Sequence, residues 1–133
     1  MLNVLVVDDS LIIRKNLHKY LVKLGHNVVE ESKTGAQAVE DCKKFKPNLV
    51  TMDITMPDMD GITAVKKIRE FDKDVSIIMI TSHGQEDMVV SSLKAGAQGY
   101  ILKPVNEEKL AKSIGALFQD YNTEADDELL DDY

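Results

Sequence analysis

The chain of 133 residues is long enough for one domain with one sizeable hydrophobic core. Its composition, 44% hydrophobic and 29% charged, is typical of a soluble globular protein. It contains no apolar run of about 18 residues, and its first residues lack the basic stretch of a signal peptide. We therefore expect neither a membrane span nor a membrane partner. The single cysteine, Cys42, excludes an intrachain disulfide and is typical of a cytoplasmic protein.

The net charge of −7 is concentrated at the C-terminal end of the sequence. Seven acidic residues and no Lys or Arg lie between positions 120 and 133, whereas the preceding 119 residues contain 16 acidic and 16 basic side chains. We expect residues 1–120 to form the folded domain and residues 121–133 to be an acidic, disordered tail or linker, in which the Leu129-Leu130 pair leaves a short docking segment open. The chain lacks a basic patch, so direct nucleic-acid binding is not expected.

In chain order, the hydrophobic pattern begins with a run rich in β-branched residues at positions 3–8, which predicts a buried strand. Ser10 follows as an N-cap. Apolar residues at helical spacing then predict a helix that ends at Gly25, a residue that tolerates positive φ. Strands are predicted at four further places: residues 27–31, 48–53, 75–81 and 99–102.

Each of these four strands precedes another stretch with helical periodicity. The apolar residues that mark the later helices are Ala38, Val39, Cys42 and Phe45; Ile62, Val65, Ile68 and Phe71; Met88, Val89 and Leu93; and Leu110, Ile114, Leu117, Phe118 and Tyr121. Five strands alternating with five helices predict an α/β fold. It is a doubly wound three-layer sandwich, in which helices cover both faces of a mostly parallel sheet.

Residues able to handle charge end or follow four of the five predicted strands. They are Asp8 and Asp9, Asp53, Thr81 and Ser82, and Lys103. Because parallel strands bring their carboxyl ends to one rim of the sheet, we expect these side chains to meet there. Clustered carboxylates repel one another, and a hard cation with oxygen ligands, such as Mg²⁺, relieves the repulsion. Carboxylates, a magnesium ion, a lysine and a hydroxyl together form a site suited to phosphoryl transfer.

Several segments around these residues resemble the receiver domains of bacterial two-component response regulators, in particular the stand-alone CheY type. The matching segments are Val6-Val7-Asp8-Asp9-Ser10, Met52-Asp53-Ile54-Thr55-Met56-Pro57, Asp60-Gly61, Thr81-Ser82, Lys94-Ala95-Gly96-Ala97 and Lys103-Pro104. The resemblance covers about residues 2–119. It rests on the order of the segments together, since each alone is unspecific. It implies a flavodoxin-like fold with the strand order 2-1-3-4-5.

Carried over position by position, the resemblance also implies roles for the residues at the rim. Asp53 is the expected phosphoryl acceptor. The expected Mg²⁺ ligands are Asp8, Asp9, Asp53 and the backbone carbonyl of Thr55. The expected phosphoryl-binding residues are Thr81, Ser82 and Lys103, and the expected switch residues are Thr81 and Tyr100. The resemblance further implies a cis peptide bond at Lys103-Pro104.

For three positions another interpretation stays open. Asp8 is also placed to help cap the first helix beside Ser10. Tyr100 is equally suited to be a core aromatic residue on an edge strand. His83, two residues beyond Thr81, is interpreted as a solvated loop histidine rather than a catalytic one.

The function that the resemblance implies is a signalling switch rather than an enzyme. A sensor histidine kinase or a phosphotransfer protein would donate the phosphoryl group. A downstream target protein would bind the face made by the fourth strand, fourth helix, fifth strand and fifth helix, and the CheY-like pattern points to chemotaxis in the cytoplasm. Two alternatives stay open: the receiver part of a longer regulator with a DNA-binding or enzymatic output, and a small free-standing phosphatase or phosphotransferase.

Residues 58–61, Asp-Met-Asp-Gly, are similar to fragments of two other motifs. In an EF-hand loop aligned on them, Met56 would occupy the first ligand position and Lys67 the last, so the calcium ligands would be missing. In a phosphatase of the haloacid dehalogenase type the first Asp would end a strand, whereas Asp58 lies inside a loop. Both interpretations are therefore rejected.

Overall fold

The computed structural model of the chain describes residues 1–118. Its elements are β1 (Asn3–Val7), α1 (Leu11–Lys23), β2 (Asn27–Ser32), α2 (Gly35–Phe45), β3 (Leu49–Met52), α3 (Gly61–Phe71), β4 (Ser76–Thr81), α4 (Glu86–Ala95), β5 (Gly99–Leu102) and α5 (Glu107–Leu117). The predicted alternation is confirmed. The expected boundary near residue 120, the acidic segment 121–133 and Tyr121 lie outside the described residues. Among the helices of residues 1–118, none has the length and apolarity needed to cross a bilayer.

All five strands form one parallel sheet in the order β2-β1-β3-β4-β5, which confirms the predicted topology. Strands β1, β3 and β4 occupy the centre and are almost fully buried, whereas β2 at one edge is only partly covered. Because β2 lies on one side of β1 and β3 on the other, the direction of winding reverses between them. The carboxyl ends of β1 and β3 therefore mark the switch point of the sheet, which is where ligands bind in open α/β folds.

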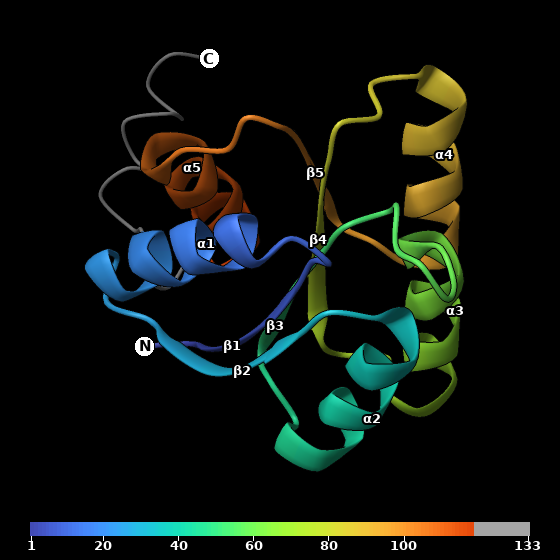
Figure 1. Cartoon of the computed structure of the whole chain (residues 1–133), viewed down its shortest axis with the longest axis horizontal. Coiled ribbons are helices and arrows are strands. Elements are labelled where there is room, and N and C mark those ends of the chain that lie inside the picture. The colour runs from blue at the N-terminus through green and yellow to red at the C-terminus, as the bar shows by residue number, and fades with distance from the viewer. Residues whose placement is uncertain (119–133) are drawn as a thin grey trace.

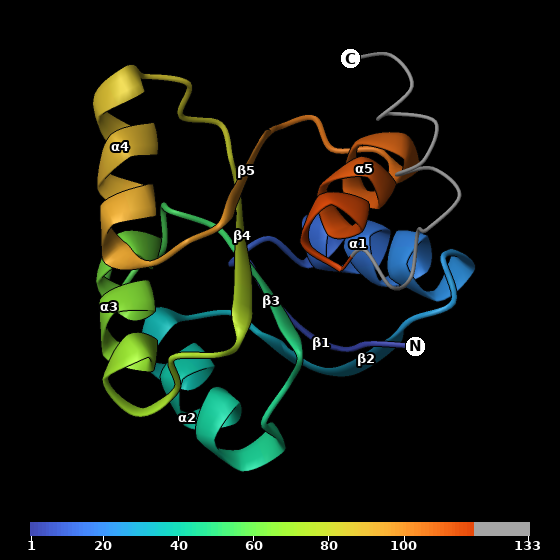
Figure 2. The same cartoon turned by 180° about the vertical axis from the view of Figure 1, so that it is seen from behind.

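The helices form a layer on each face of the sheet (Figure 1 and Figure 2). α1 and α5 cover one face, and α2, α3 and α4 cover the other. Under α1 and α5, Leu17 and Leu110 are fully buried against sheet residues such as Val6 and Ile80. Burial of each such side chain stabilises the fold by about 1.5–3 kcal/mol relative to leaving it exposed, so both layers fix the sheet and the rim above it.

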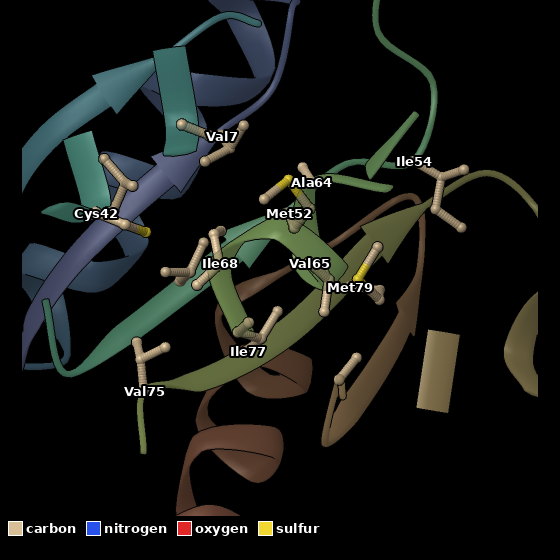
Figure 3. Packing of buried hydrophobic residues seen from close by; sticks show 14 of the residues in the cluster. Val7, Cys42, Met52, Ile54, Ala64, Val65, Ile68, Val75, Ile77 and Met79 are labelled. Atoms are coloured by element: carbon tan, nitrogen blue, oxygen red, sulfur yellow. The ribbon is translucent and has the colours of Figure 1, made fainter. Parts of the chain in front are cut away.

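Figure 3 shows the core on the opposite face, where Cys42 of α2 and Ile68 of α3 pack against the sheet side chains Val7, Met52 and Met79. Cys42 behaves as the small core residue that its position predicts. Burial, followed by the nearby charge of Asp72, raises the pKa of its thiol to about 12.

Within residues 1–118, four of the five helices begin with a side-chain cap. The capping bonds run from the backbone N–H of Ile13 to Ser10 (3.3 Å), of Gln37 to Thr34 (3.1 Å), of Thr63 to Asp60 (2.8 Å) and of Lys109 to Asn106 (2.8 Å). α4 instead begins after Gln85, whose side chain makes no capping bond. The N-terminal turn of α4 is thus held less firmly than the others, because its first N–H groups lack a side-chain partner.

The apolar residues that mark α4 in the sequence are not its most buried ones. Met88 and Val89 are half-buried, and Leu93 is 49% exposed. The fully buried residue is Ser92, whose hydroxyl donates a hydrogen bond to the carbonyl of Met88 at 2.8 Å. Phe71 at the end of α3 is also 42% exposed. Because α4 packs mainly against α3 rather than on the sheet, its apolar spacing does not identify its inner face.

Candidate functional site

Three carboxylates predicted to meet at the carboxyl rim of the sheet do meet there. Asp8 and Asp9 follow β1, and Asp53 follows β3. Each offers an oxygen within 4.8 Å of the other two. Asp8 is 1% and Asp53 5% exposed, whereas Asp9 faces solvent. Two charged groups are therefore held away from water beside a third, which is costly unless a cation compensates.

Lys103, immediately after β5, is the cation of this rim. Its ammonium lies 2.9 Å from an oxygen of Asp8 and 3.5 Å from an oxygen of Asp53. Its backbone N–H donates to the carbonyl of Thr81 at 2.8 Å, so β4 fixes the place where the lysine turns inward. The following peptide bond, Lys103-Pro104, is cis, as predicted.

The ionisation of the rim shows that one lysine does not neutralise three carboxylates. Burial raises the pKa of Asp53 to about 6, and the charge of Asp8 adds to the rise, while Lys103 opposes it. For Lys103, burial disfavours the charged form, but the hydrogen bond to Asp8 and the charge of Asp53 outweigh it and raise the pKa. The ammonium is therefore fixed as a cation, and Asp53 retains an uncompensated charge at neutral pH.

Asp8 makes the contact expected of a residue that helps to cap the first helix, and it also binds Lys103. One carboxylate oxygen binds Lys103, and the other accepts the backbone N–H of Ser10 at 2.9 Å, just before α1 begins. In addition, the Arg14 guanidinium donates to the backbone carbonyl of Asp8 at 2.7 Å. The residue is thus held from both its side chain and its main chain.

The hydroxyl residues lie on the β4 side of the rim. Thr81 is fully buried, and its hydroxyl oxygen accepts the backbone N–H of His83 at 3.3 Å. Ser82 is exposed at the start of the following loop. The Tyr100 hydroxyl donates to the backbone carbonyl of His83, and the Tyr100 ring packs on the core beneath α2 and α3. The two expected switch residues are thus joined through the backbone of His83.

Two contacts near the rim were not predicted from the sequence. The His83 ring nitrogen Nε2 lies 2.7 Å from the Thr55 hydroxyl, so this histidine bridges two loops rather than only facing solvent. Asp58, in the loop after β3, accepts backbone N–H groups at the start of α2. No local sequence pattern predicts either contact, because the partners are more than twenty residues apart in sequence.

The donor set of the rim fits a hard divalent cation. Its three carboxylates supply oxygen ligands, and the loop carrying Thr55 lies beside them with Thr55 at the surface. Carboxylate oxygens with room for water are what Mg²⁺ prefers. The excess of negative charge over the single Lys103 ammonium gives the site a physical reason to bind such an ion.

Comparison with known proteins agrees with this architecture. The model of the response regulator receiver domain family matches residues 4–115. The chain is 47% identical over 111 residues to the chemotaxis protein CheY of Bacillus subtilis, covering 84% of this chain and 92% of that protein. It is 41% identical to the chemotaxis protein CheY of Thermotoga maritima with the same shares covered. The protein belongs to the response regulator receiver domain family and is of the CheY-like type.

A solved structure similar to this chain is that of the CheX–CheY–BeF3–Mg+2 complex from Borrelia burgdorferi. The match has a TM-score of 0.85 and 39% sequence identity, and it covers 87% of this chain and 88% of that one. A CheY-like receiver domain protein from Methanospirillum hungatei matches with a TM-score of 0.82 and 30% identity over 92% of this chain and 97% of that one. The rim described above therefore lies in a fold shared with a Mg²⁺-containing relative.

Proposed function

We propose that this protein is a phosphorylation switch that accepts a phosphoryl group on Asp53 from a phosphohistidine of a sensor kinase or phosphotransfer protein. The observation that carries the proposal is the environment of Asp53. Its carboxylate is nearly buried, has a raised pKa, and lies beside Asp8 and 3.5 Å from the fixed ammonium of Lys103. A perturbed carboxylate at such a rim is suited to act on a charged ligand.

In the proposed transfer, an oxygen of Asp53 forms a bond to phosphorus while the phosphorus–nitrogen bond to the donor imidazole breaks. Lys103 binds an oxygen of the transferred group, and the hydroxyls of Thr81 and Ser82 donate hydrogen bonds to it. Asp8, Asp9, Asp53 and the carbonyl of Thr55 would hold Mg²⁺. When bound, the ion neutralises the charge that the phosphoryl oxygens bring to the acidic rim. The residues act mainly by positioning and by charge, as phosphoryl transfer requires.

The proposed output passes from Thr81 to Tyr100. A phosphoryl group on Asp53 attracts the Thr81 hydroxyl, which in this state accepts the N–H of His83. Breaking that contact releases the His83 segment that also binds the Tyr100 hydroxyl. The surface of β4, α4, β5 and α5 changes as a result and would bind a target protein. The curated relatives are chemotaxis proteins, which supports a chemotaxis role.

The remaining assignments follow from this proposal. A CheY-like receiver is consistent with a signalling switch rather than a classical enzyme. We place the receiver in residues 1–120, with 121–133 as an acidic tail or linker, in a cytoplasmic protein. A receiver portion of a longer regulator and a free-standing phosphatase remain the alternatives, and no feature of the described residues favours either.

The acceptor is tested by labelling with radioactive acetyl phosphate in the presence of Mg²⁺. Asp53→Asn should abolish labelling, because the amide cannot form the acyl phosphate. Asp60→Asn is the matched control: it removes a carboxylate from the same region but keeps a residue able to cap α3, so it should label like the wild type. Labelling of Asp53→Asn at the wild-type level would overturn the assignment of the acceptor.

The output is tested by NMR with beryllofluoride and Mg²⁺ as a stable phosphoryl mimic. The wild type should show shifted resonances at Thr81, Tyr100 and Met88. Thr81→Ala should still be labelled at Asp53 but should lose the shifts at Tyr100 and Met88. Unchanged spectra of Tyr100 and α4 in the wild type, with binding of the mimic confirmed at Asp53, would overturn the coupling and leave the acceptor in place.

A further inference from the structure

Asp58 forms a cap on a helix that belongs to another part of the chain. One of its carboxylate oxygens accepts the backbone N–H of Gly35 at 2.9 Å, and the other accepts that of Ala36 at 2.8 Å. These hydrogen bonds, that of Ala36 first, lower the pKa of Asp58, although burial opposes them. The carboxylate is therefore ionised at neutral pH. It binds the positive end of α2 with both oxygens.

The other cap of α2 comes from its own chain segment. Thr34, the residue before the helix, accepts the N–H of Gln37 at 3.1 Å. Thr34 and Asp58 thus satisfy different donors in the same turn. Removal of either costs α2 a capping interaction, but of these two residues Asp58 alone belongs to the loop after β3. An effect that follows removal of Asp58 but not removal of Thr34 must therefore act through that loop.

The loop between β3 and α3 is fixed at two places, and Thr55 lies between them. At its base, the N–H of Gly61 donates to the carbonyl of Ile54 at 2.7 Å. A Cβ on Gly61 would stand 2.0 Å from the Asp53 carbonyl oxygen, so the start of α3 is pressed against the acceptor residue. Farther along the loop, the bonds from Asp58 to α2 form the second attachment.

Contact between Met59 and α2 adds to the second attachment. A Cβ on Gly35 would lie 2.2 Å from Cγ of Met59, so that position has room only for glycine in this arrangement. α2 is in turn fixed to the core through the buried side chains of Ala38 and Cys42. The loop is therefore attached to a helix that cannot shift freely over the sheet.

We infer that Asp58 is a positioning residue for the metal site: by fastening the loop to α2, it fixes the Thr55 carbonyl where it can complete the Mg²⁺ ligands. The inference rests on the proposed function, since Mg²⁺ binding by Asp8, Asp9, Asp53 and Thr55 is part of that proposal. Outer-shell contacts that orient ligands change metal affinity by about 10-fold or more when they are removed. The Asp58–α2 bonds are contacts of this kind, because they act on a ligand-bearing loop and not on the ion.

The test measures Mg²⁺ affinity by isothermal titration calorimetry for the wild type, Asp58→Ala and Thr34→Ala. Asp58→Ala should raise the Mg²⁺ dissociation constant about 10-fold, while acetyl phosphate labelling recovers at saturating Mg²⁺. Thr34→Ala removes a cap from the same helix and should leave the constant within about twofold of the wild type. Asp60→Asn, which removes a charge from the end of the same loop, should also leave it within about twofold, excluding a simple charge effect.

Asp58→Asn provides a milder variant, since its single amide oxygen can accept one of the two N–H groups. It provides the measurement if Asp58→Ala proves too unstable to purify. Where both variants fold, the Mg²⁺ dissociation constant of Asp58→Asn should lie between those of the wild type and Asp58→Ala. The inference is overturned if the Asp58 variants bind Mg²⁺ like the wild type, or if Thr34→Ala weakens binding equally. It is distinguishable from failure of the proposed function. Absence of Mg²⁺ binding by the wild type, or binding that persists unchanged in Asp53→Asn, would overturn the metal site itself and this inference with it.

Discussion

Two clusters of charge lie close together in this protein and have opposite compositions. In the Glu31 cluster, between α1 and β2, one carboxylate binds Arg14 (3.3 Å), Lys15 (3.4 Å) and His18 (3.1 Å). In the rim cluster, the carboxylates of Asp8, Asp9 and Asp53 share one lysine, Lys103. Arg14 contacts both, since it also donates to the Asp8 carbonyl. In the first cluster the cations Arg14 and Lys15 outnumber the carboxylate, and in the second the carboxylates outnumber the lysine.

The pKa values respond in opposite directions. At Glu31 burial opposes ionisation, but hydrogen bonds from His18 and Lys15 outweigh it and lower the pKa. At Asp53 burial and the neighbouring Asp8 raise the pKa to about 6. Ionised Glu31 therefore stabilises the fold, and ionised Asp53 destabilises it. The contrast separates a cluster whose carboxylate is matched by cations of the chain from one whose carboxylates outnumber them.

The largest expected effect is on the rim cluster. In Mg²⁺-free buffer at pH 7.5, Asp53→Asn should raise the free energy of unfolding by on the order of 3 kcal/mol, because it removes the charge that a shift from 3.8 to about 6 makes unfavourable. Above pH 6 the gain should be constant. As the pH falls toward 4, wild-type Asp53 takes up a proton and the gain should vanish. Urea denaturation between pH 4 and 8 measures this difference in the free energy of unfolding. If Asp53→Asn is no more stable than the wild type at pH 7.5, the prediction is wrong.

The same kind of substitution should have the opposite sign at Glu31. Glu31→Gln leaves the Arg14 guanidinium, 11% exposed, without its carboxylate, and should lower the free energy of unfolding by about 2 kcal/mol at pH 7. A lowered carboxyl pKa stabilises above about 4.5 and loses that effect as the pH falls through the folded-state value, so the difference should shrink in acid. Exposed Glu30→Gln is the matched control and should be nearly neutral. If Glu30→Gln and Glu31→Gln change the free energy of unfolding equally, the ion pairs of Glu31 do not stabilise the fold.

Mg²⁺ should act on the rim cluster alone. At ten times its dissociation constant, the ion should stabilise the wild type by about 1.4 kcal/mol. Asp9→Ala should lose most of that gain, because an exposed carboxylate ligand is removed with little change in packing. Glu31→Gln should keep the full gain despite its lower stability. Thermal melts with and without Mg²⁺ measure this stabilisation for each variant. If Asp9→Ala keeps the full stabilisation by Mg²⁺, Asp9 is not a ligand of the metal site.

The smallest effect is expected at the periphery of the Glu31 cluster. The Lys15 side chain is 65% exposed, so Lys15→Met should change the free energy of unfolding by less than about 0.5 kcal/mol. The change should diminish further in high salt, which screens an exposed pair. A loss as large as that of Glu31→Gln, measured in the same urea series, would show that the cluster depends on its outer pair.

The sequence predicts those parts of the molecule whose signals are local. Alternating apolar runs identify the strands, and because parallel strand ends converge, the meeting of Asp8, Asp53 and Lys103 is predictable from the order of the residues alone. Asp58 and His83 could not be placed, because their partners lie in other loops. The exposure of Leu93 cannot be predicted from helical spacing either, since it depends on α4 packing mainly against α3.

The burial of Cys42 has a practical consequence for kinetic work. A thiol with a pKa of about 12, enclosed between α2 and the sheet, has almost no thiolate at neutral pH and no path to a reagent. Alkylation should therefore proceed only when the core opens, and its rate under native conditions reports the frequency of that opening. For the same reason Cys42 should not react with a thiol-specific fluorophore under native conditions. A cysteine introduced at exposed Val90 on α4 can therefore be labelled without removal of Cys42. The alkylation rate of Cys42 thus measures how often the core opens, and a fluorophore at position 90 can report movement of α4 without interference from the native thiol.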